Sequence, residues 1–574
     1  MAIAVTMTRS TCSPEACAEP GAEGLVIAVL VVVQCAMRAM ALFNHQIDSD
    51  EPQHLHVIWG WNQGLVQYRD VFDNHAPLFH LLMAPVMGLL GERADIILLG
   101  RILLLPLVAL SLWATYRLGR LLWSPRTGAW AALGASVSPT WLLTSAEFRA
   151  DILWMAAWLC ALVVLLGGPW SGRRGFIGGL LLGVALVTSL KTILLLVALA
   201  IAVTVVASAR PRDRTVARVG EWARAFGWVA AGFVVLPVLI VLGFWWIGGL
   251  DAMRYCTLEH NIVPRLGHWG TGSLRPWLLP GVLMAMIPAA RWLLSRSDRA
   301  APAQGRRVVL LLSTGCFIGF LESCWPLITP EDYLPWIPML ALVVAAAVHR
   351  MWRWNQPEEH SRIARRGALC TLGLIVALEM FSVFEVEPIW RRWRDPQVQL
   401  LGDVLRLTRA HESIMDLKGE TVFRPRPYYF ALEGVTKCRL ALGLLPDRIE
   451  NDVRHARTHF ATPDNPGFPP AAREFLNTHF LPDRSLRVLG ADLGSDRRAT
   501  SRPFDVSYSE RFAILADGLP GRGRLDGATY RTARVLHSGP HVYHPAPGES
   551  HVVLIWDGAL HRFDTAAQIA KGPA

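Results

Sequence analysis

The chain has 574 residues, of which 52% are hydrophobic and only 18% are charged, and its mean hydropathy is +0.32. This composition excludes a small soluble domain and indicates a membrane protein over most of the length. The formal charge of +10 is spread in short segments between apolar runs, so a nucleic-acid partner is not expected. The nine cysteines show no CxxC pair or zinc spacing. A disulfide between Cys256 and Cys438 would require both to lie outside the cytoplasm.

The first elements expected in chain order are a tail and a membrane helix. Residues 1–22 are polar and rich in Pro, Ser and Ala, which is typical of a disordered segment, here placed in the cytoplasm. The apolar run from Leu25 to Phe43 predicts an uncleaved first span. The Ala39-Met-Ala41 sequence would also suit the cleavage site of a signal peptide. With either interpretation, the segment that follows lies outside the cytoplasm.

Residues 45–94 are predicted to form a first outer loop with two helices that lie in the membrane interface. Between Leu55 and Val66, apolar residues recur at helical spacing among polar ones, which is typical of an interfacial helix. The run from Ala76 to Leu90 is apolar, but it is shorter than the ~20 residues that a span requires. It predicts a second interfacial or re-entrant helix, with a short tilted span as the alternative.

Further apolar runs predict a polytopic α-helical membrane domain over residues 23–387, with about 11 transmembrane helices. After the first, these spans are expected at residues 95–116, 127–143, 151–169, 175–190, 192–208, 226–247, 277–294, 308–324, 333–349 and 367–386. The loops assigned to the cytoplasm, with their flanks, contain 20 arginines, whereas the opposite loops contain seven basic residues. A wrong span count would mix the two sets, so the positive-inside rule favours this arrangement.

Residues 388–574 are predicted to form a soluble extracytoplasmic α/β domain with its own core. Their composition is polar and rich in Arg, Pro and His, and no further span is expected. Strands are predicted at residues 486–489, 512–515 and 551–556, and helices at 448–459 and 471–476.

The stretch Asp48-Ser-Asp50-Glu51-Pro52 places three carboxylates at a membrane boundary. Pro52 suits the first turn of a helix, where the partial positive charge of the helix N-terminus keeps acids ionised. An ionised acid that faces a membrane groove is costly unless it has a function or a partner. We therefore expect Asp50 and Glu51 to be functional, although acids that follow a span can also be simply solvated.

More polar side chains gather on the same outer side. They are Glu147, Arg149 and Asp151, then Lys191, then the loop of 248–276, and then the turn of 325–335 with Tyr333. A local ion pair would also explain Glu147 with Asp151, and Lys191 could reach lipid head groups. Arg101 lies inside an apolar run and is expected to face a cavity rather than lipid. The histidines of the first outer loop do not have the spacing of a compact metal site.

An ionised carboxylate beside cations at the lipid boundary suits group transfer from a lipid phosphate. The acid can act as a general base for an incoming hydroxyl. Arginine or lysine can hold the phosphate that leaves. A substrate with a lipid tail would reach such a site from the bilayer.

These residues resemble the motifs of the C-type-fold membrane glycosyltransferases, and in particular the protein O-mannosyltransferase and aminoarabinose transferase superfamily (glycosyltransferase family 39-like). Asp50-Glu51 matches its Asp-Glu pair after the first span. The stretch from Tyr68 to Leu78 is similar to a His-Pro-Pro-Leu element, with Ala76 in place of the first proline. The remaining matches are Arg101, Arg149-Ala-Asp151, Lys191 after a Gly-rich helix, and Tyr333-Leu-Pro335. The resemblance covers residues 23–386.

The resemblance implies an inverting transferase that moves a hexose or pentose from a polyprenyl-phosphate carrier to a hydroxyl of a glycan, lipid or protein. Asp50 would be the catalytic base, and Glu51 and Asp151 would orient the base or the acceptor. Asp48, which the motif does not include, is then expected to be merely solvated. The residues expected to hold the carrier phosphate are Arg149, Lys191 and Arg101, and those expected to contact substrate are His75, Glu147 and Tyr333. No cofactor is required, although the acids permit a divalent Mg or Mn ion.

Two other classes of function stay open at this point. A transporter or flippase of lipid-linked sugars would place charges near the middle of the membrane, in broken and repeated helices. A non-catalytic assembly protein could retain the same fold. The composition suggests a multi-pass protein of a bacterial inner membrane, in contact with membrane lipids, with a cytoplasmic N-terminus and a periplasmic C-terminal domain.

Overall fold

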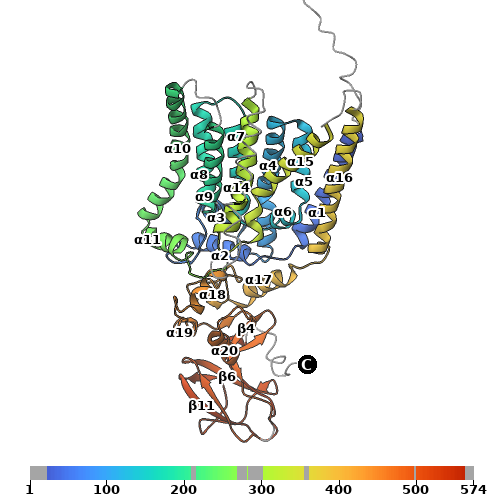
Figure 1. The fold of residues 1–574 in the computed structure, drawn as a ribbon. Coiled ribbons are helices and arrows are strands. Elements are labelled where there is room, and N and C mark those ends of the chain that lie inside the picture. Colours follow the sequence, from blue (N-terminus) through green and yellow to red (C-terminus); the bar gives the residue numbers. More distant parts are fainter. Residues whose placement is uncertain are drawn as a thin grey trace, which may run out of the picture.

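The computed structural model describes residues 22–208, 215–267, 281, 302–353, 361–496, 499–560 and 562. A helical body is followed by a smaller domain with β-sheets, which projects from one end of the body (Figure 1). The predicted tail lies outside the described residues, as does the predicted span at 277–294 except for Gly281.

The helices of the body stand mostly side by side (Figure 1). Their bounds are α1 (Ala22–Asn44), α2 (Asp50–Asn62), α3 (Leu78–Leu90), α4 (Ile96–Leu122), α5 (Pro125–Val137), α6 (Pro139–Thr144), α7 (Ala150–Leu166), α8 (Gly172–Thr188), α9 (Thr192–Ser208), α10 (Thr215–Trp246), α11 (Leu250–Arg254), η2 (Tyr255–Glu259), α14 (Pro302–Cys324), η4 (Pro330–Tyr333), α15 (Trp336–Arg353) and α16 (Ser361–Val386).

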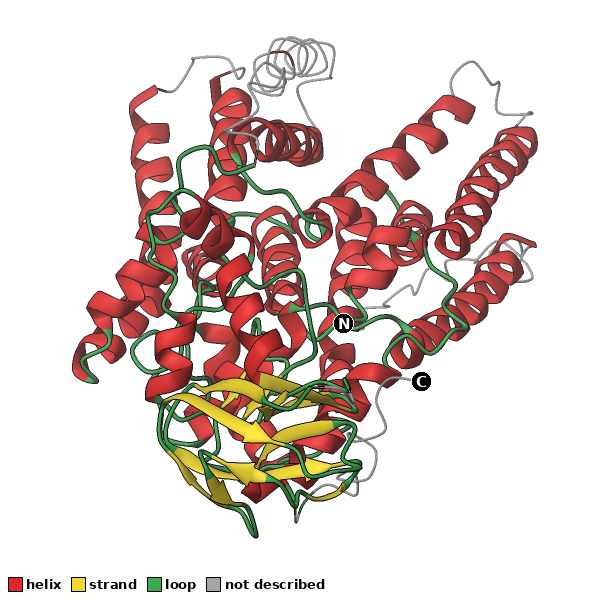
Figure 2. Ribbon diagram, turned by 90° about the horizontal axis from the view of Figure 1, so that it is seen from below, coloured by secondary structure: helices red, strands yellow, loops and turns green. Residues whose placement is uncertain are grey.

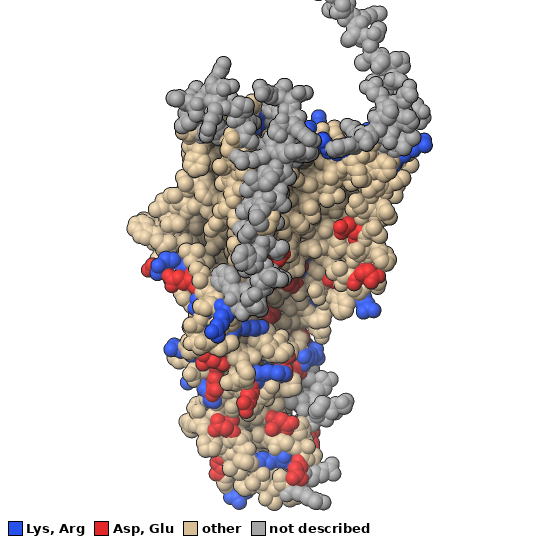
Figure 3. Space-filling view, viewed as in Figure 1, with Lys and Arg blue, Asp and Glu red and all other residues tan. Residues whose placement is uncertain are grey.

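Five of the described helices are long and apolar enough to cross a membrane. They are Glu23–Asn44, Ile96–Leu122, Ala223–Trp246, Gln304–Cys324 and Arg366–Val386. Shorter apolar helices are Leu78–Leu90, Ala150–Leu166, Thr192–Ser208 and Trp336–Trp352. On the face drawn in Figure 3, the flank of the body carries few charged side chains. Charged side chains are more frequent on the C-terminal domain. The total of about 11 spans stays a prediction.

The prediction of one continuous helix over residues 127–143 was wrong. The segment forms two helices, α5 and α6, which meet at Ser138 and Pro139. The ring of Pro139 disfavours a helical conformation at the preceding residue, and Ser138 has a ψ of 128°. The break directs α6 towards the loop that carries Glu147 and Arg149.

The first outer loop contains two short helices, as the sequence predicted. α2 lies across the end of the body that is nearest the C-terminal domain (Figure 1) and packs on α3. Asp50 and Glu51 are in the first turn of α2, which is where the helix dipole favours acids. Helix α2 is therefore the element that places the acidic stretch at the junction of the two parts.

The C-terminal domain contains all the strands and helices predicted for it. Its helices are α17 (Asp395–Leu407), α18 (Gly434–Ala441), α19 (Ile449–His455), α20 (Pro470–His479) and η6 (Asp557–Ala559). Its strands are β1 (Ile414–Met415), β2 (Phe460–Ala461), β3 (Phe480–Asp483), β4 (Leu486–Asp492), β5 (Arg502–Val506), β6 (Glu510–Ala516), β7 (Leu519–Pro520), β8 (Arg524–Leu525), β9 (Ala528–Thr529), β10 (Arg534–Leu536), β11 (Gly539–His544) and β12 (Val552–Trp556).

These strands form two sheets, drawn in yellow in Figure 2. The larger has the order β1-β2-β4-β12-β6-β10, with β3 beside β4 and β7 beside β6, and the smaller has the order β5-β11-β8-β9. Strand β12 is antiparallel to both neighbours, with Leu554 opposite Ala491 and Ile514. All five residues of β12 are buried, which makes this strand the centre of the domain core.

An apolar cluster joins the C-terminal domain to the body. Its buried members are Val66, Tyr68, Phe72, Phe244, Cys256 and Ala431. The ring of Phe72 is 5.5 Å from that of Tyr429 and 5.2 Å from that of Phe430. Cys256 and Cys438 are free thiols. This contact holds the residues after β1 against the first outer loop.

Candidate active site

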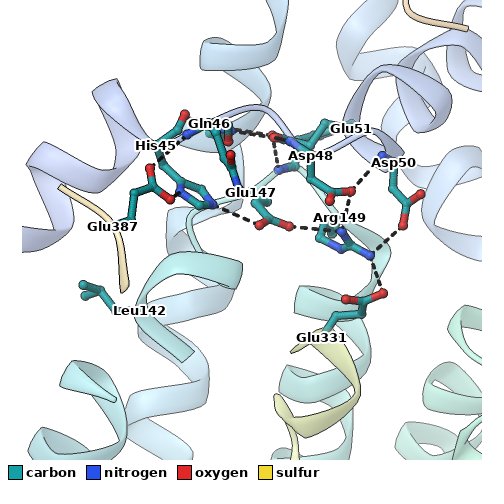
Figure 4. A network of polar contacts seen from close by, with 12 residues as sticks. His45, Gln46, Asp48, Asp50, Glu51, Leu142, Glu147, Arg149, Glu331 and Glu387 are labelled. Atoms are coloured by element: carbon teal, nitrogen blue, oxygen red, sulfur yellow. Dashed lines mark hydrogen bonds and ion pairs between the residues drawn. The ribbon is translucent and has the colours of Figure 1, made fainter. Parts of the chain in front are cut away.

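Arg149, directly before α7, is the centre of a network of acids (Figure 4). Its side chain is only 3% exposed. The oxygens that its guanidinium contacts belong to Asp50 (2.7 Å), Glu331 (2.7 Å), Asp48 (2.8 Å), Glu147 (3.1 Å) and Asp151 (3.5 Å). Three segments of the chain thus meet at one buried cation: residues 48–50, residues 147–151 and the turn with Glu331.

Asp50 lies between two cations. Its Oδ2 accepts a hydrogen bond from Arg149, and its Oδ1 accepts one from the ammonium of Lys418 in the C-terminal domain. Burial alone would raise the pKa of Asp50, but Lys418 and Arg149 hold it well below its ordinary value. Asp50 is therefore an ionised carboxylate with low exposure.

The expectation that Asp48 is merely solvated was wrong. Asp48 Oδ1 accepts a hydrogen bond from Arg149 at 2.8 Å and another from the amide of Asp50, also at 2.8 Å. Its side chain is 40% exposed, which makes it the most accessible of the acids around Arg149. Asp48 therefore orients the backbone and the cation beside Asp50.

Glu51 and Arg101 form a buried ion pair. Their side chains are 0% and 1% exposed, and Arg101 Nε lies 2.7 Å from Glu51 Oε2. The remaining donors of Arg101 bond to Glu51 Oε1 and to the carbonyls of Leu42, His45 and Gln46. Glu51 also accepts the amide of Phe148 at 2.7 Å. The pair connects α2, α4 and the loops that follow α1 and α6.

His45 links two further acids at the edge of the network. Its Nε2 lies 3.1 Å from Glu147 and its Nδ1 lies 2.7 Å from Glu387 (Figure 4). Burial would lower the pKa of His45, but the two carboxylates raise it to about 9. Burial raises the pKa of Glu147 to about 7, although His45 and Arg149 oppose this shift. Glu147 is thus part of an ion-pair chain rather than a free acid.

Lys191 is held by the turn η4 before α15. Its ammonium contacts Asp332 Oδ1, and Asp332 Oδ2 accepts the amide of Thr329 at 3.0 Å. Burial would lower the pKa of Lys191, but Asp332 and the other nearby acids raise it above its ordinary value. Glu331, the residue before Asp332, binds Arg149, so η4 connects Lys191 with the acid network.

His75 belongs to a polar cluster next to Asp50. Its Nδ1 lies 2.8 Å from Asp73, and its ring centroid lies 4.7 Å from that of His54. Burial would lower the pKa of His75, but Asp73 raises it. His54 Nδ1 bonds His80 Nε2 at 2.8 Å, whereas His54 Nε2 is buried with no partner among the described residues.

Tyr333 lies in the same turn as Glu331 and Asp332, and its hydroxyl donates to Glu322 of α14 at 2.5 Å. The structure therefore gathers Asp50, Glu147, Arg149 and Asp151 in one network. It places Lys191 at the edge of the network and directs Tyr333 towards α14. Among the described residues, no three His, Cys, Asp or Glu side chains form a group that could hold a metal ion.

Three residues of this site were not among the predicted site residues. Glu331 and Asp332 stand between Pro330 and the Tyr333 motif, so their position could have selected them. Lys418 is 368 residues away from Asp50 in the chain. One sequence signal could have found it, because only Lys191, Lys418, Lys437 and Lys571 are lysines among the 56 basic residues.

A comparison with protein-family models finds one match. Residues 74–242 match the model of the dolichyl-phosphate-mannose-protein mannosyltransferase family. The match begins at Asn74, next to His75, and includes Arg101, Arg149, Asp151 and Lys191. No curated protein sequence matches the chain.

Two solved structures of ArnT share the fold of this chain. ArnT from Cupriavidus metallidurans bound to undecaprenyl phosphate is 16% identical with a TM-score of 0.52, over 82% of this chain and 98% of ArnT. The apo form of ArnT is 15% identical with a TM-score of 0.53, over 81% and 97%. The Archaeoglobus fulgidus oligosaccharyltransferase in its apo form is 12% identical with a TM-score of 0.47, over 78% and 70%. The resemblance to C-type membrane glycosyltransferases that the motifs predicted is confirmed.

Proposed function

We propose that the protein is an inverting glycosyltransferase that moves a sugar from a polyprenyl-phosphate carrier to an acceptor hydroxyl on the outer face of the membrane. The observation that carries this proposal is Asp50, an ionised and shielded carboxylate at the junction of the helical body and the C-terminal domain. The family domain and the fold shared with ArnT bound to undecaprenyl phosphate support a lipid-linked sugar donor.

Asp50 would act as the general base. The acceptor oxygen attacks the anomeric carbon of the sugar, and its proton passes to the Asp50 carboxylate. The bond between the anomeric carbon and the phosphate oxygen breaks, and its electron pair stays on the phosphate. Asp151 and Glu147 contribute by holding Arg149 beside Asp50, and His75 would contact the substrate near the base.

The hydrogen-bond donors at the site favour Lys191 over the arginines as the ligand of the carrier phosphate. Each donor nitrogen of Arg149 and Arg101 already has an acceptor. Among the described residues, the ammonium of Lys191 bonds Asp332, although it has three N–H donors. We therefore assign Arg101 and Glu51 to positioning α2, and Arg149 to positioning the acids.

We further propose that transfer requires no metal or other cofactor. The acids nearest the reacting centre are already paired with Arg149, Lys418 and Lys191, so the part of the chain that the structure describes offers no oxygen-rich cage of the kind that Mg²⁺ or Mn²⁺ occupies. Transfer by the purified protein should then persist in the presence of a chelator.

The Asp50→Asn variant tests the proposal. We expect it to lose transfer, because the amide cannot accept the proton, and to bind undecaprenyl phosphate at least as tightly as the wild type. The measurement is mass spectrometry of surface glycans, lipids and secreted proteins from cells that lack the gene or carry each variant. Asp95→Asn is the matched control, since Asp95 is an exposed acid that pairs with Arg93. Normal transfer by Asp50→Asn would refute the assignment.

The same experiment separates the enzyme from a transporter or an assembly protein. An enzyme releases free polyprenyl phosphate when it transfers the sugar, whereas the other two classes leave the sugar on its carrier. The position of the charges favours the enzyme, because the acids around Arg149 include Asp50, which contacts Lys418 of the C-terminal domain, and therefore lie at the end of the body next to that domain. The proposed location is a bacterial inner membrane.

A further inference from the structure

The C-terminal domain contributes one side chain to the acid network of the body. Lys418 lies between β1 and α18, and its ammonium contacts Asp50 Oδ1 and, at 3.0 Å, the hydroxyl of Ser49. The side chains of Lys418 and Asp50 are 11% and 17% exposed. The two residues therefore form a shielded ion pair between the two parts of the molecule.

The turn that carries Lys418 has its own internal support. Asp416 accepts hydrogen bonds from the amides of Gly419 at 2.9 Å and Thr421 at 3.0 Å. Arg426 Nε donates to the same carboxylate at 2.6 Å. These bonds fix the turn from both sides of Lys418, so only its long side chain is free to change partner.

The turn also packs directly against α2. Gly419 has a φ of +93°, and a Cβ at this position would lie 2.8 Å from Cβ of His56. Only glycine accommodates both the backbone conformation and the close contact. The ring of His56 bonds the carbonyl of Val422 at 2.8 Å. Lys418 is thus aimed at the same helix that carries Asp50.

The charged groups around Lys418 and Asp50 determine how strong a base Asp50 is. Asp50 faces Lys418, Arg149, His75 and His54, and Lys418 faces Asp50, Asp48 and Glu433. While the ammonium stays beside it, Asp50 is ionised but is a weak base, because the cation stabilises the carboxylate over its protonated form. A base that must accept a proton gains strength when such a cation departs.

We propose that Lys418 is an ammonium switch, which pairs with Asp50 in the unliganded protein and with the phosphate of the lipid carrier when the carrier binds. This inference rests on the proposed function. Lys418 keeps its proton throughout, and only its partner changes. Its departure leaves Asp50 a stronger base for the acceptor hydroxyl. At the phosphate, the same ammonium meets the charge that develops when the bond to the sugar breaks.

Two observations favour this exchange over a fixed ion pair. Among the described residues, the Lys418 ammonium bonds Asp50 and Ser49, so one of its three N–H donors remains for a third acceptor. Lysine also carries a compact charge on a flexible stem, unlike the planar and multiply bonded guanidinium of Arg149. Basic residues of this chain are overwhelmingly arginine, yet lysine stands at both positions where an ammonium contacts an acid of the site, Lys191 and Lys418.

Binding of undecaprenyl phosphate to the full-length protein tests the switch. Lys418→Met should weaken binding about tenfold or more, because a charge-assisted hydrogen bond is lost, and Lys418→Arg should retain most of the affinity. Asp50→Asn should tighten binding severalfold, because Lys418 is then released to the phosphate. This gain should disappear in the Asp50→Asn/Lys418→Met double variant, which has no ammonium to release.

Lys437→Met is the matched control, because Lys437 is an exposed lysine on α18 of the same domain, and its affinity should equal that of the wild type. Equal affinity of the wild type and Lys418→Met would overturn the switch. A gain from Asp50→Asn that persists without Lys418 would also overturn it, since Asp50 would then simply repel the phosphate. The proposed function has a separate test. Normal sugar transfer by Asp50→Asn would refute the glycosyltransferase assignment whatever the affinity measurements give.

Discussion

At the scale of single residues, the arginines and the lysines of the site differ in how many of their hydrogen-bond donors still lack an acceptor. Arg149 and Arg101 are buried, and their donors are already used by carboxylates and carbonyls. Lys191 and Lys418 each reach the network from its edge and have few partners among the described residues. The arginines therefore suit fixed support, and the lysines suit contact with a phosphate that comes and goes.

Arg101→Met tests the supporting role directly. The change leaves Glu51 buried without its cation, so we expect a loss of about 3–5 kcal/mol in the free energy of unfolding. The measurement is thermal or denaturant unfolding of the purified protein in detergent. Affinity for undecaprenyl phosphate in the folded fraction should be unchanged, in contrast to Lys191→Met and Lys418→Met.

Two control variants accompany Arg101→Met. Arg93→Met removes an exposed ion pair with Asp95 and should change stability by less than about 1 kcal/mol. The Glu51→Leu/Arg101→Met double variant removes both buried charges and should recover much of the loss. A stable Arg101→Met protein that no longer binds the carrier would instead restore the phosphate role predicted from the sequence.

At the scale of elements, local sequence signals located most helices of the body, but only three of the described strands, which are β4, β6 and β12. Long apolar runs located the long helices of the body, and Pro52 with the acids after α1 located the start of α2. The break at Ser138 was missed because apolarity continues across Pro139 and only the proline marks the change. Short strands such as β1 and β2 gave no pattern, because two residues cannot show a period.

A prediction at the scale of elements concerns the close packing of α8 against α10 at Gly179. A Cβ on Gly179 would lie 2.0 Å from the carbonyl oxygen of Val229 in α10, so the two helices pack through this glycine. We expect Gly179→Ala to push α8 from α10, to lower stability by about 1–3 kcal/mol, and to reduce transfer by displacing Lys191 at the end of α8.

Gly227→Ala on α10 is the matched control, since a Cβ there meets no atom within 4 Å. Stability is read from the unfolding temperature in detergent, and transfer is read from surface glycans. Equal behaviour of the two alanine variants would show that the close approach of α8 and α10 has no energetic weight.

At the scale of the whole molecule, the site lies where the helical body and the C-terminal domain meet. The sequence predicted that Asp50, Arg149 and Asp151 lie on one side, because each lies beside an apolar run whose direction the positive-inside rule predicts, and the structure brings the three side chains together. It could not place Lys418, since nothing local indicates which turn of the C-terminal domain packs on α2. The contact depends on tertiary packing: Gly419 packs against His56, and the ring of Phe72 packs against that of Tyr429.

The contact between Lys418 and Asp50 places the C-terminal domain on the same side of the membrane as Asp50, and the proposed function requires that this be the outer side. We expect Thr529→Cys, at an exposed position on β9, to react with a membrane-impermeant maleimide in intact spheroplasts. Arg120→Cys, at an exposed position near the end of α4, should react only after the cells are opened, because the basic loops face the cytoplasm. Both variants are compared in a background whose native cysteines are replaced by alanine. The reverse labelling pattern would place Asp50 and Lys418 in the cytoplasm, and would then contradict transfer on the outer face while leaving the Asp50–Lys418 pair intact.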